Sequence, residues 1–114
     1  MKLSIITINY NTQKLLEDCL VSIKRYLDVK DYEVIVVDNA SEKFSPAQLK
    51  KILPDISVIQ AESNLGFAKA NNLAAKQAKG EYLWFLNSDT KLNKDSNISA
   101  LIQFLDSHKE YGAV

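Results

Sequence analysis

The chain has 114 residues, 46% hydrophobic and 25% charged, and its 14 basic residues balance 14 acidic ones. This length suits one domain with a single core. A protein that binds nucleic acid through phosphates normally has a basic surplus, so we expect no nucleic-acid partner. The single cysteine, Cys19, excludes an internal disulfide and a zinc site built from several cysteines. The residues after Met1 are too few and too polar for a signal peptide, and no apolar run approaches the ~18 residues of a membrane span. We therefore expect a cytoplasmic location.

The first half of the chain alternates strand and helix patterns. Residues 3–8 are rich in β-branched side chains and predict a strand, after which Asn11 or Thr12 can cap a helix. That helix has one apolar stripe, formed by Leu15, Leu16, Cys19, Leu20, Ile23 and Leu27. Residues 33–38 predict a second strand. Pro46 suits the first turn of a short second helix.

The second half continues the same alternation. Residues 56–59 predict a short third strand, and the helix after Gly66 has an apolar face of small residues. Residues 82–86 are all apolar or aromatic, which is typical of a strand buried on both faces. A last helix spans residues 98–105, and residues 112–114 resemble the start of a fifth strand. The order βαβαβαβα predicts an α/β fold with a mainly parallel sheet and right-handed crossovers.

Several nucleotide-binding and signalling folds share this layout but lack support here. A dinucleotide fingerprint and a P-loop need glycines after the first strand, and none of the three glycines of the chain lies there. A receiver domain carries an acidic pair at that place, where this chain has Asn9 and Tyr10.

Asp38 and Asp89 are the positive signal, because each follows an apolar strand. Each carboxylate alone is equally consistent with a simple turn. The carboxyl ends of parallel strands lie at one edge of the sheet, where open α/β sheets bind their ligands. The two carboxylates are therefore predicted to lie at a common ligand site.

Four blocks in order extend this argument: residues 4–11 (SIITINYN), 36–41 (VVDNAS), 64–72 (NLGFAKANN) and 85–90 (FLNSDT). Together they closely resemble the N-terminal half of family 2 glycosyltransferases of the GT-A fold. The resemblance implies a Rossmann-like three-layer sandwich, with residues 1–114 as the incomplete nucleotide-diphospho-sugar-binding part. The asparagine-rich blocks are most similar to the rhamnosyltransferase-type branch.

The resemblance implies that Ile8, Asn9, Tyr10 and Asp38 bind the nucleotide. Asp38 would accept a hydrogen bond from the imide N–H of uracil or thymine, so the expected donor is a UDP- or dTDP-sugar. Tyr10 would pack on the base, although an ordinary core or lid aromatic is the alternative.

The segment Asn87–Asp89 stands where the family has its metal-binding motif. Asp89 would bind Mg²⁺ or Mn²⁺ between the two phosphates, Asn87 would offer an oxygen to metal or ribose, and Ser88 would be a further ligand-binding residue. Asn87 replaces the usual aspartate, which should weaken the metal site. Asn71 replaces an arginine that many members use for the nucleotide, and a buried amide bonded to backbone is equally consistent with it.

By resemblance, the full enzyme transfers sugar with inversion to the hydroxyl of a saccharide or glycolipid acceptor, which would bring it to the inner membrane face. The catalytic base is expected beyond Val114, so this chain alone should not transfer sugar. We also expect self-association through the unfinished sheet edge. A non-catalytic nucleotide-binding fragment and a sugar nucleotidyltransferase are the alternatives, although the latter needs a Gly-rich basic loop after the first strand.

Overall fold

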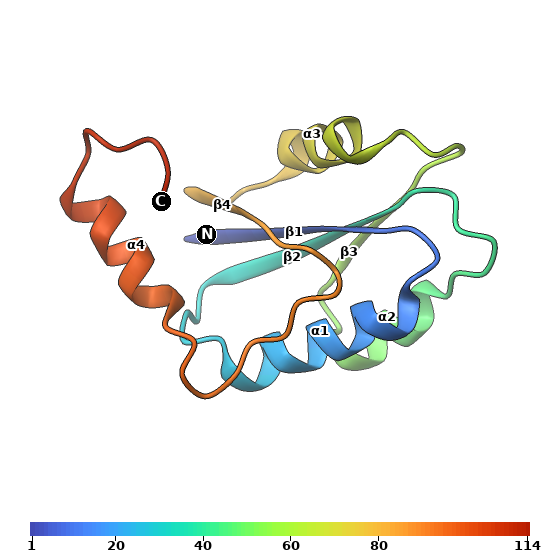
Figure 1. Cartoon of the computed structure of the whole chain (residues 1–114), viewed down its shortest axis with the longest axis horizontal. Helices are drawn as coiled ribbons and strands as arrows, with labels where there is room; N and C mark the ends of the chain where they lie inside the picture. Colours follow the sequence, from blue (N-terminus) through green and yellow to red (C-terminus); the bar gives the residue numbers. More distant parts are fainter.

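Four parallel strands form one sheet in the computed structural model, which describes residues 1–114 (Figure 1). The strands are β1 (Leu3–Asn9), β2 (Tyr32–Asp38), β3 (Ser57–Gln60) and β4 (Tyr82–Phe85). Their spatial order is β3-β2-β1-β4. The chain therefore builds outward from β1 to β3 and then returns to the other side of β1 for β4. All four predicted strands and the parallel sheet are confirmed.

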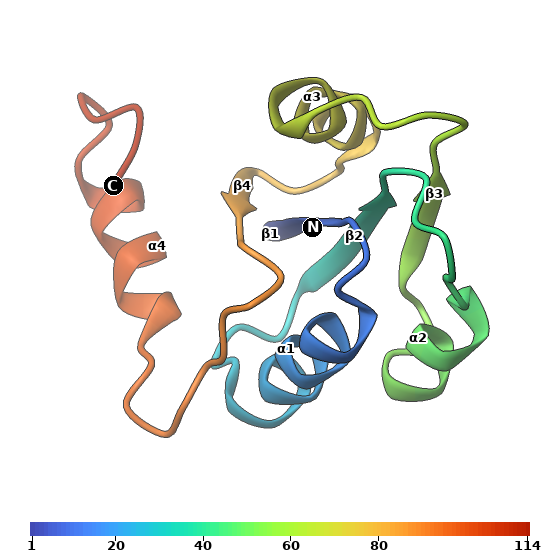
Figure 2. The same ribbon diagram turned by 45° about the vertical axis from the view of Figure 1, so that its right-hand side comes forward.

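Three helices separate the strands and form the outer layers, and a fourth follows the last strand. They are α1 (Gln13–Tyr26), α2 (Pro46–Ile52), α3 (Phe67–Gln77) and α4 (Ile98–Ser107). Figure 1 shows α1 and α2 on one face of the sheet and α3 on the other, which confirms the predicted three layers. In Figure 2, α4 lies to the side of the sheet, beyond β4. None of the four helices is long and apolar enough to cross a membrane.

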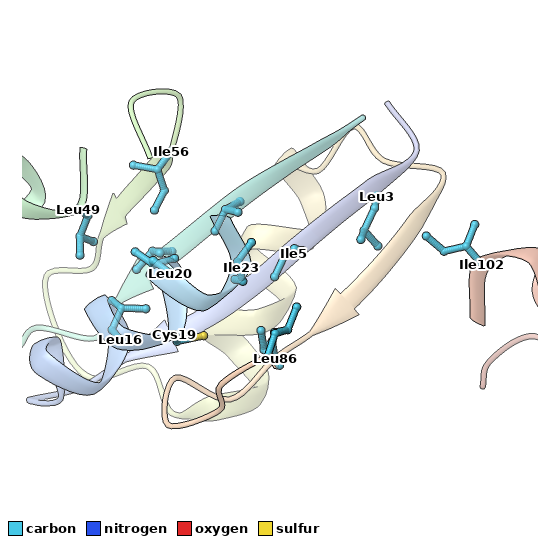
Figure 3. Packing of buried hydrophobic residues seen from close by; sticks show 13 residues of the cluster. Leu3, Ile5, Leu16, Cys19, Leu20, Ile23, Leu49, Ile56, Leu86 and Ile102 are labelled. Atoms are coloured by element: carbon cyan, nitrogen blue, oxygen red, sulfur yellow. The ribbon is translucent and has the colours of Figure 1, made fainter. Parts of the chain in front are cut away.

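The larger part of the core lies between the sheet and α1. Leu3 and Ile5 of β1 pack there with Leu16, Leu20 and Ile23 of α1 (Figure 3). Side chains alternate along a strand, so the residues between them face α3 instead. This packing confirms the predicted apolar stripe of the first helix except at Leu15, which is 45% exposed and lies outside the core.

The opposite face holds a smaller cluster. Ile6, Ile35 and Val37 pack there against Ala70 and Ala74, and all five side chains are buried. The two alanines are small, so the backbone of α3 can lie close to the sheet.

The register between strands sets the shape of the carboxyl edge. Asn9 lies level with Asp38 on β2, whereas β4 ends level with Ile6. The amide of Leu86 still donates to the Ile6 carbonyl at 2.9 Å, and the chain then leaves the sheet. Residues 87–89 therefore follow directly on the strand that borders β1.

The prediction that β4 is buried on both faces is wrong. Leu83 and Phe85 are 41% and 49% exposed, and Trp84 is only half-buried. The reason is the position of β4 at the edge of the sheet, because α3 packs on β1 and β2 and leaves that face of β4 uncovered. Residues 112–114 form no strand, although they line an apolar groove between β4 and α4.

Two carboxylates attach α4 to the rest of the molecule. At its start, Asp28 accepts hydrogen bonds from the amides of Ile98 and Ser99 at 3.1 and 3.0 Å. Near its end, Asp106 accepts from the Tyr82 hydroxyl at 2.6 Å and from Lys2 Nζ at 2.9 Å. The α4 helix is thus held at both ends by polar contacts, with apolar side chains between them.

A close approach explains Gly80, which joins α3 to β4. A Cβ atom at this position would lie 2.5 Å from the backbone nitrogen of Ser4, closer than any side chain tolerates. The Gly80 amide instead donates to Ser4 Oγ at 2.8 Å. This contact fixes where β4 begins beside β1.

Candidate functional site

A cleft of about 470 Å³ opens at the carboxyl edge of the sheet. Its walls come from segments that follow all four strands and from the first turn of α1. The lining residues are Ile8, Tyr10, Thr12, Leu15, Asn39, Asn64, Gly66, Phe67, Asn87, Ser88 and Asp89. A cleft at this edge is where an open parallel sheet binds its ligand.

Five predicted site residues line the cleft: Ile8, Tyr10, Asn87, Ser88 and Asp89. Tyr10 is 50% exposed, so its ring face is free to stack on a planar ligand. Asp89 is exposed and is the only carboxylate among the lining residues. Asp89 thus lines the cleft, whereas Asp38, which was predicted to share a ligand site with it, is not among the lining residues.

Asn9 and Asp38 lie just beneath this surface, with 0% and 3% exposure. Asp38 Oδ1 accepts from Asn9 Nδ2 at 2.9 Å and from Ser41 Oγ at 2.6 Å. Asp38 Oδ2 accepts only from the Ser41 amide, at 3.1 Å. Asp38 therefore stabilises a turn, as one interpretation predicted. A carboxylate has about four acceptor positions, so one position on Oδ2 has no partner within the protein, and the contact of Asp38 with a nucleotide stays a prediction.

Thr12 connects the buried pair to the cleft. Its Oγ1 donates to Asn9 Oδ1 at 2.9 Å and lies 3.3 Å from Ser88 Oγ. Thr12 occupies the N-cap position of α1 as predicted, but its side chain makes no capping hydrogen bond. The hydroxyl is instead used between strands, so the predicted capping by Asn11 or Thr12 does not occur.

Asn71 stands apart from the other predicted residues. It is buried on α3, and its Nδ2 donates to the Phe67 carbonyl of the preceding turn at 3.1 Å. It does not line the cleft, although Phe67 does. The structure thus agrees with the alternative that Asn71 is a buried amide bonded to the backbone.

Six lining residues were not predicted: Thr12, Leu15, Asn39, Asn64, Gly66 and Phe67. Asn39 joins two of the loops, because its side chain donates to the Gly66 carbonyl and accepts from the Leu65 amide, each at 3.2 Å. Gly66 has a φ of 81°, a conformation that favours glycine. Their place was implicit in the sequence, since Asn39 follows Asp38 and the Asn64–Phe67 turn follows the third strand at the same sheet edge.

The donor set of the cleft fits a hard divalent cation held jointly with a ligand. No group of three or more His, Cys, Asp or Glu side chains gathers anywhere in the chain. Asp89, Asn87 and Ser88 offer one carboxylate, one amide oxygen and one hydroxyl, all of the oxygen type that Mg²⁺ and Mn²⁺ prefer. A cation bound here would need further oxygens, which a diphosphate supplies.

Cys19 lies in α1 near this end of the molecule and is fully buried. Burial, with a smaller contribution from the negative charge of Asp89, raises the pKa of the Cys19 thiol to about 11. A thiol that stays protonated at neutral pH is neither a nucleophile nor a good metal ligand. Cys19 therefore belongs to the core, as predicted.

The fold and the cleft define an α/β protein with a ligand cleft at the carboxyl edge of a parallel sheet, and the comparison with known families identifies it further. The model of the glycosyl transferase family 2 matches residues 4–114. The chain belongs to this family. A relative is the poly(ribitol-phosphate) beta-N-acetylglucosaminyltransferase TarS of Staphylococcus aureus, 34% identical over 112 residues. The match covers 95% of this chain but only 19% of the relative.

Solved structures agree with the fold. A crystal structure of S. aureus TarS residues 1–349 in complex with UDP has a TM-score of 0.82 and 34% identity, covering 96% of this chain and 33% of that one. A mannosyltransferase from Pyrobaculum calidifontis, in complex with GDP-Man and Mn²⁺, has a TM-score of 0.78 and 27% identity, covering 91% and 32%. These glycosyltransferase structures confirm the fold class.

Proposed function

We propose that this chain binds the nucleoside-diphosphate part of a UDP- or dTDP-sugar, as the donor-binding part of an inverting family 2 glycosyltransferase. The observation that supports it most is the arrangement of the cleft. Tyr10 and Asp89, which follow β1 and β4, line one opening of about 470 Å³, and the Asp38 carboxylate at the end of β2 lies next in sequence to the lining residue Asn39. The similar structures in complex with UDP and with GDP-Man are in line with nucleotide binding by this fold.

In this proposal each group has a separate task. The Tyr10 ring stacks on the base, and the free acceptor position of Asp38 Oδ2 receives one N–H from it. Uracil and thymine offer such an imide donor, whereas the same edge of cytosine is an acceptor. Since Asp38 is only 3% exposed, this contact requires the base to enter the cleft edge-on.

Asp89, with Asn87 and Ser88, would hold Mg²⁺ or Mn²⁺ against the diphosphate. The cation, when bound, neutralises charge that develops on the departing nucleoside diphosphate. Asp89 is the only carboxylate of the lining and is assigned to this task. The proposal therefore gives these residues donor binding, and deprotonation of the acceptor hydroxyl falls to a group outside this lining.

The acceptor is proposed as a saccharide or a polyol-phosphate polymer, because the relative named above acts on poly(ribitol-phosphate) by its name. The test is calorimetry of UDP, dTDP, CDP, ADP and GDP with the purified chain, in Mg²⁺, in Mn²⁺ and in EDTA. We expect UDP and dTDP to bind best, and better with metal. The proposal would be contradicted if all five nucleotides bound equally well or if none of them bound.

A further inference from the structure

The side-chain hydrogen bonds beneath the cleft form a connected series in which every donor points the same way along the series. Asp38 is surrounded by donors only, the two nitrogens and one hydroxyl described above. A carboxylate accepts and does not donate, so Asn9 must turn its Nδ2 toward Asp38. The opposite amide orientation would set the Asn9 carbonyl against the carboxylate, which fixes the assignment of the two Asn9 atoms.

The Asn9 orientation decides the next link. Its Oδ1 now faces Thr12, and an amide oxygen can only accept, so the 2.9 Å contact uses the proton of the Thr12 hydroxyl. A hydroxyl has one proton. In the 3.3 Å contact between Thr12 Oγ1 and Ser88 Oγ, geometry alone allows either oxygen to donate. With the Thr12 proton already used, Ser88 must be the donor.

The chain of donation therefore runs from Ser88 to Thr12, then to Asn9 and finally to Asp38. Its four members come from the segment after β4, the start of α1, the end of β1 and the end of β2. Asn9 and Asp38 are buried and Thr12 and Ser88 half-buried, so water competes weakly for these bonds. Ser88, which lines the cleft, has committed its only proton inward.

We propose that Thr12 is a positioning residue that couples the base end of the cleft to its diphosphate end and makes the Ser88 hydroxyl a pure acceptor toward ligand. Ser88 then takes an electropositive group, either a divalent cation or the hydrogen of a ribose hydroxyl. It does not donate to a phosphate oxygen. This inference rests on the proposed binding of a nucleoside diphosphate, but the bond chain itself exists without ligand.

The first experiment uses the ligand-free protein, so its result is independent of the proposed function. The side-chain NH₂ resonances of Asn9 are followed by ¹⁵N NMR in the wild type, Ser88→Ala and Thr12→Val. Ser88 has no direct contact with Asn9 among the hydrogen bonds of the structure, and the two communicate through Thr12. Shifts of these resonances in both variants are expected. Unchanged Asn9 resonances in Ser88→Ala would overturn the coupling.

The second experiment measures the affinity for UDP with Mg²⁺ and with EDTA. Thr12→Val removes the acceptor that holds the Ser88 proton inward, so the Ser88 oxygen is no longer oriented in advance toward the ligand. Relative to the wild type, we expect Thr12→Val to weaken the binding of UDP in Mg²⁺ by about fivefold or more, the equivalent of one net hydrogen bond, and Thr12→Ser to restore it. Thr7→Val is the matched control, because Thr7 Oγ1 is buried without any hydrogen-bond partner.

EDTA and a nucleotide without the 2′-hydroxyl distinguish the two groups that Ser88 could contact, the cation and the ribose. If Ser88 ligates the cation, the loss of UDP affinity in Thr12→Val disappears in EDTA. If Ser88 accepts from the ribose, the loss persists in EDTA and disappears with 2′-deoxy-UDP. An unchanged UDP affinity of Thr12→Val in both media, with circular dichroism showing an intact fold, would overturn the positioning role. Failure of the wild type to bind UDP would instead contradict the proposed function.

Discussion

Asn9 and Asp38 lie level with each other on neighbouring parallel strands and share a 2.9 Å hydrogen bond at the end of the sheet. The Asp38 carboxylate is therefore oriented by the central strand as well as by its own turn. Its Oδ1 is occupied by Asn9 and Ser41, which leaves Oδ2 as the oxygen available to a ligand. In the proposed function, a single available acceptor would give the site a preference among bases.

That preference leads to the first prediction. Asp38→Ala should remove the advantage of UDP and dTDP over CDP, because one hydrogen bond to a charged acceptor contributes roughly 1.5–3 kcal/mol, about ten- to hundred-fold in affinity. Calorimetry with the three nucleotides measures the change. Glu42→Ala, an exposed neighbour in the same loop, is the control and should keep the preference. A UDP preference that survives in Asp38→Ala would rule out this assignment.

Asp89 gives a prediction about metal. Asp89→Asn keeps the size of the side chain but removes its charge, so Mn²⁺ or Mg²⁺ should no longer strengthen the binding of UDP. The affinity in EDTA should stay close to that of the wild type. Asp95→Asn removes an exposed carboxylate of the segment that follows and should leave the metal effect intact. The assignment of Asp89 fails if its variant responds to metal as the wild type does.

Thr7 gives a prediction about stability. Its Oγ1 is the only buried side-chain N or O atom without a hydrogen-bond partner, so the folded state leaves this hydroxyl unsatisfied. Thr7→Val replaces it with a methyl group of similar shape and should raise the free energy of unfolding by about 1 kcal/mol. Urea denaturation followed by Trp84 fluorescence measures the change. A less stable Thr7→Val variant would mean that the hydroxyl has a partner in solution.

Asp28 gives a prediction about pH. Hydrogen bonds from Ser99, through its hydroxyl and its amide, and from the Ile98 amide lower the pKa of Asp28. A carboxyl whose pKa is lower in the folded state stabilises the fold above its unfolded pKa of about 3.9, and this stabilisation is lost as the pH falls through the folded value. Attachment of α4 should therefore be constant near neutrality and weaken only in acid.

Amide hydrogen exchange of α4 tests this prediction. Asp28→Ala should speed exchange across α4 at neutral pH, with a cost at the low end of the roughly 0.5–2 kcal/mol of a helix cap because the site is exposed. Asp18→Ala, which removes only an exposed pair with Lys14, should not. Equal exchange rates in the two variants would show that the apolar contacts of α4 are enough to hold the helix in place without Asp28.

The uncovered face of β4 gives a prediction about self-association. β4 is an edge strand, and its exposed Leu83 and Phe85 lie beside an apolar groove. Such edges tend to pair with another chain. Light scattering should show a mass that rises with concentration, and Leu83→Lys should lower it. A constant monomer mass at high micromolar concentration would refute this.

Much of the fold was predictable because the strands are short apolar runs that end in polar residues at Asn9, Asp38 and Asn87. The exposure of β4 was not predictable from its composition, since a central strand and an edge strand can share the same apolar run. The role of Thr12 was hidden for a similar reason. A threonine before a helix predicts a cap. The contact of its hydroxyl with Ser88 depends on how the segment after β4 packs, which the local sequence does not show.

The strand order β3-β2-β1-β4 also determines when the cleft is made during synthesis of the chain. The ends of β1 and β2, with Tyr10 and Asp38, are complete early, because these strands and α1 are consecutive. β4 must then find the free side of β1, a contact between distant parts of the chain that forms slowly. In terms of the proposed function, an emerging polypeptide would complete the segments assigned to the base first, and the segment assigned to the diphosphate would join them only when β4 docks.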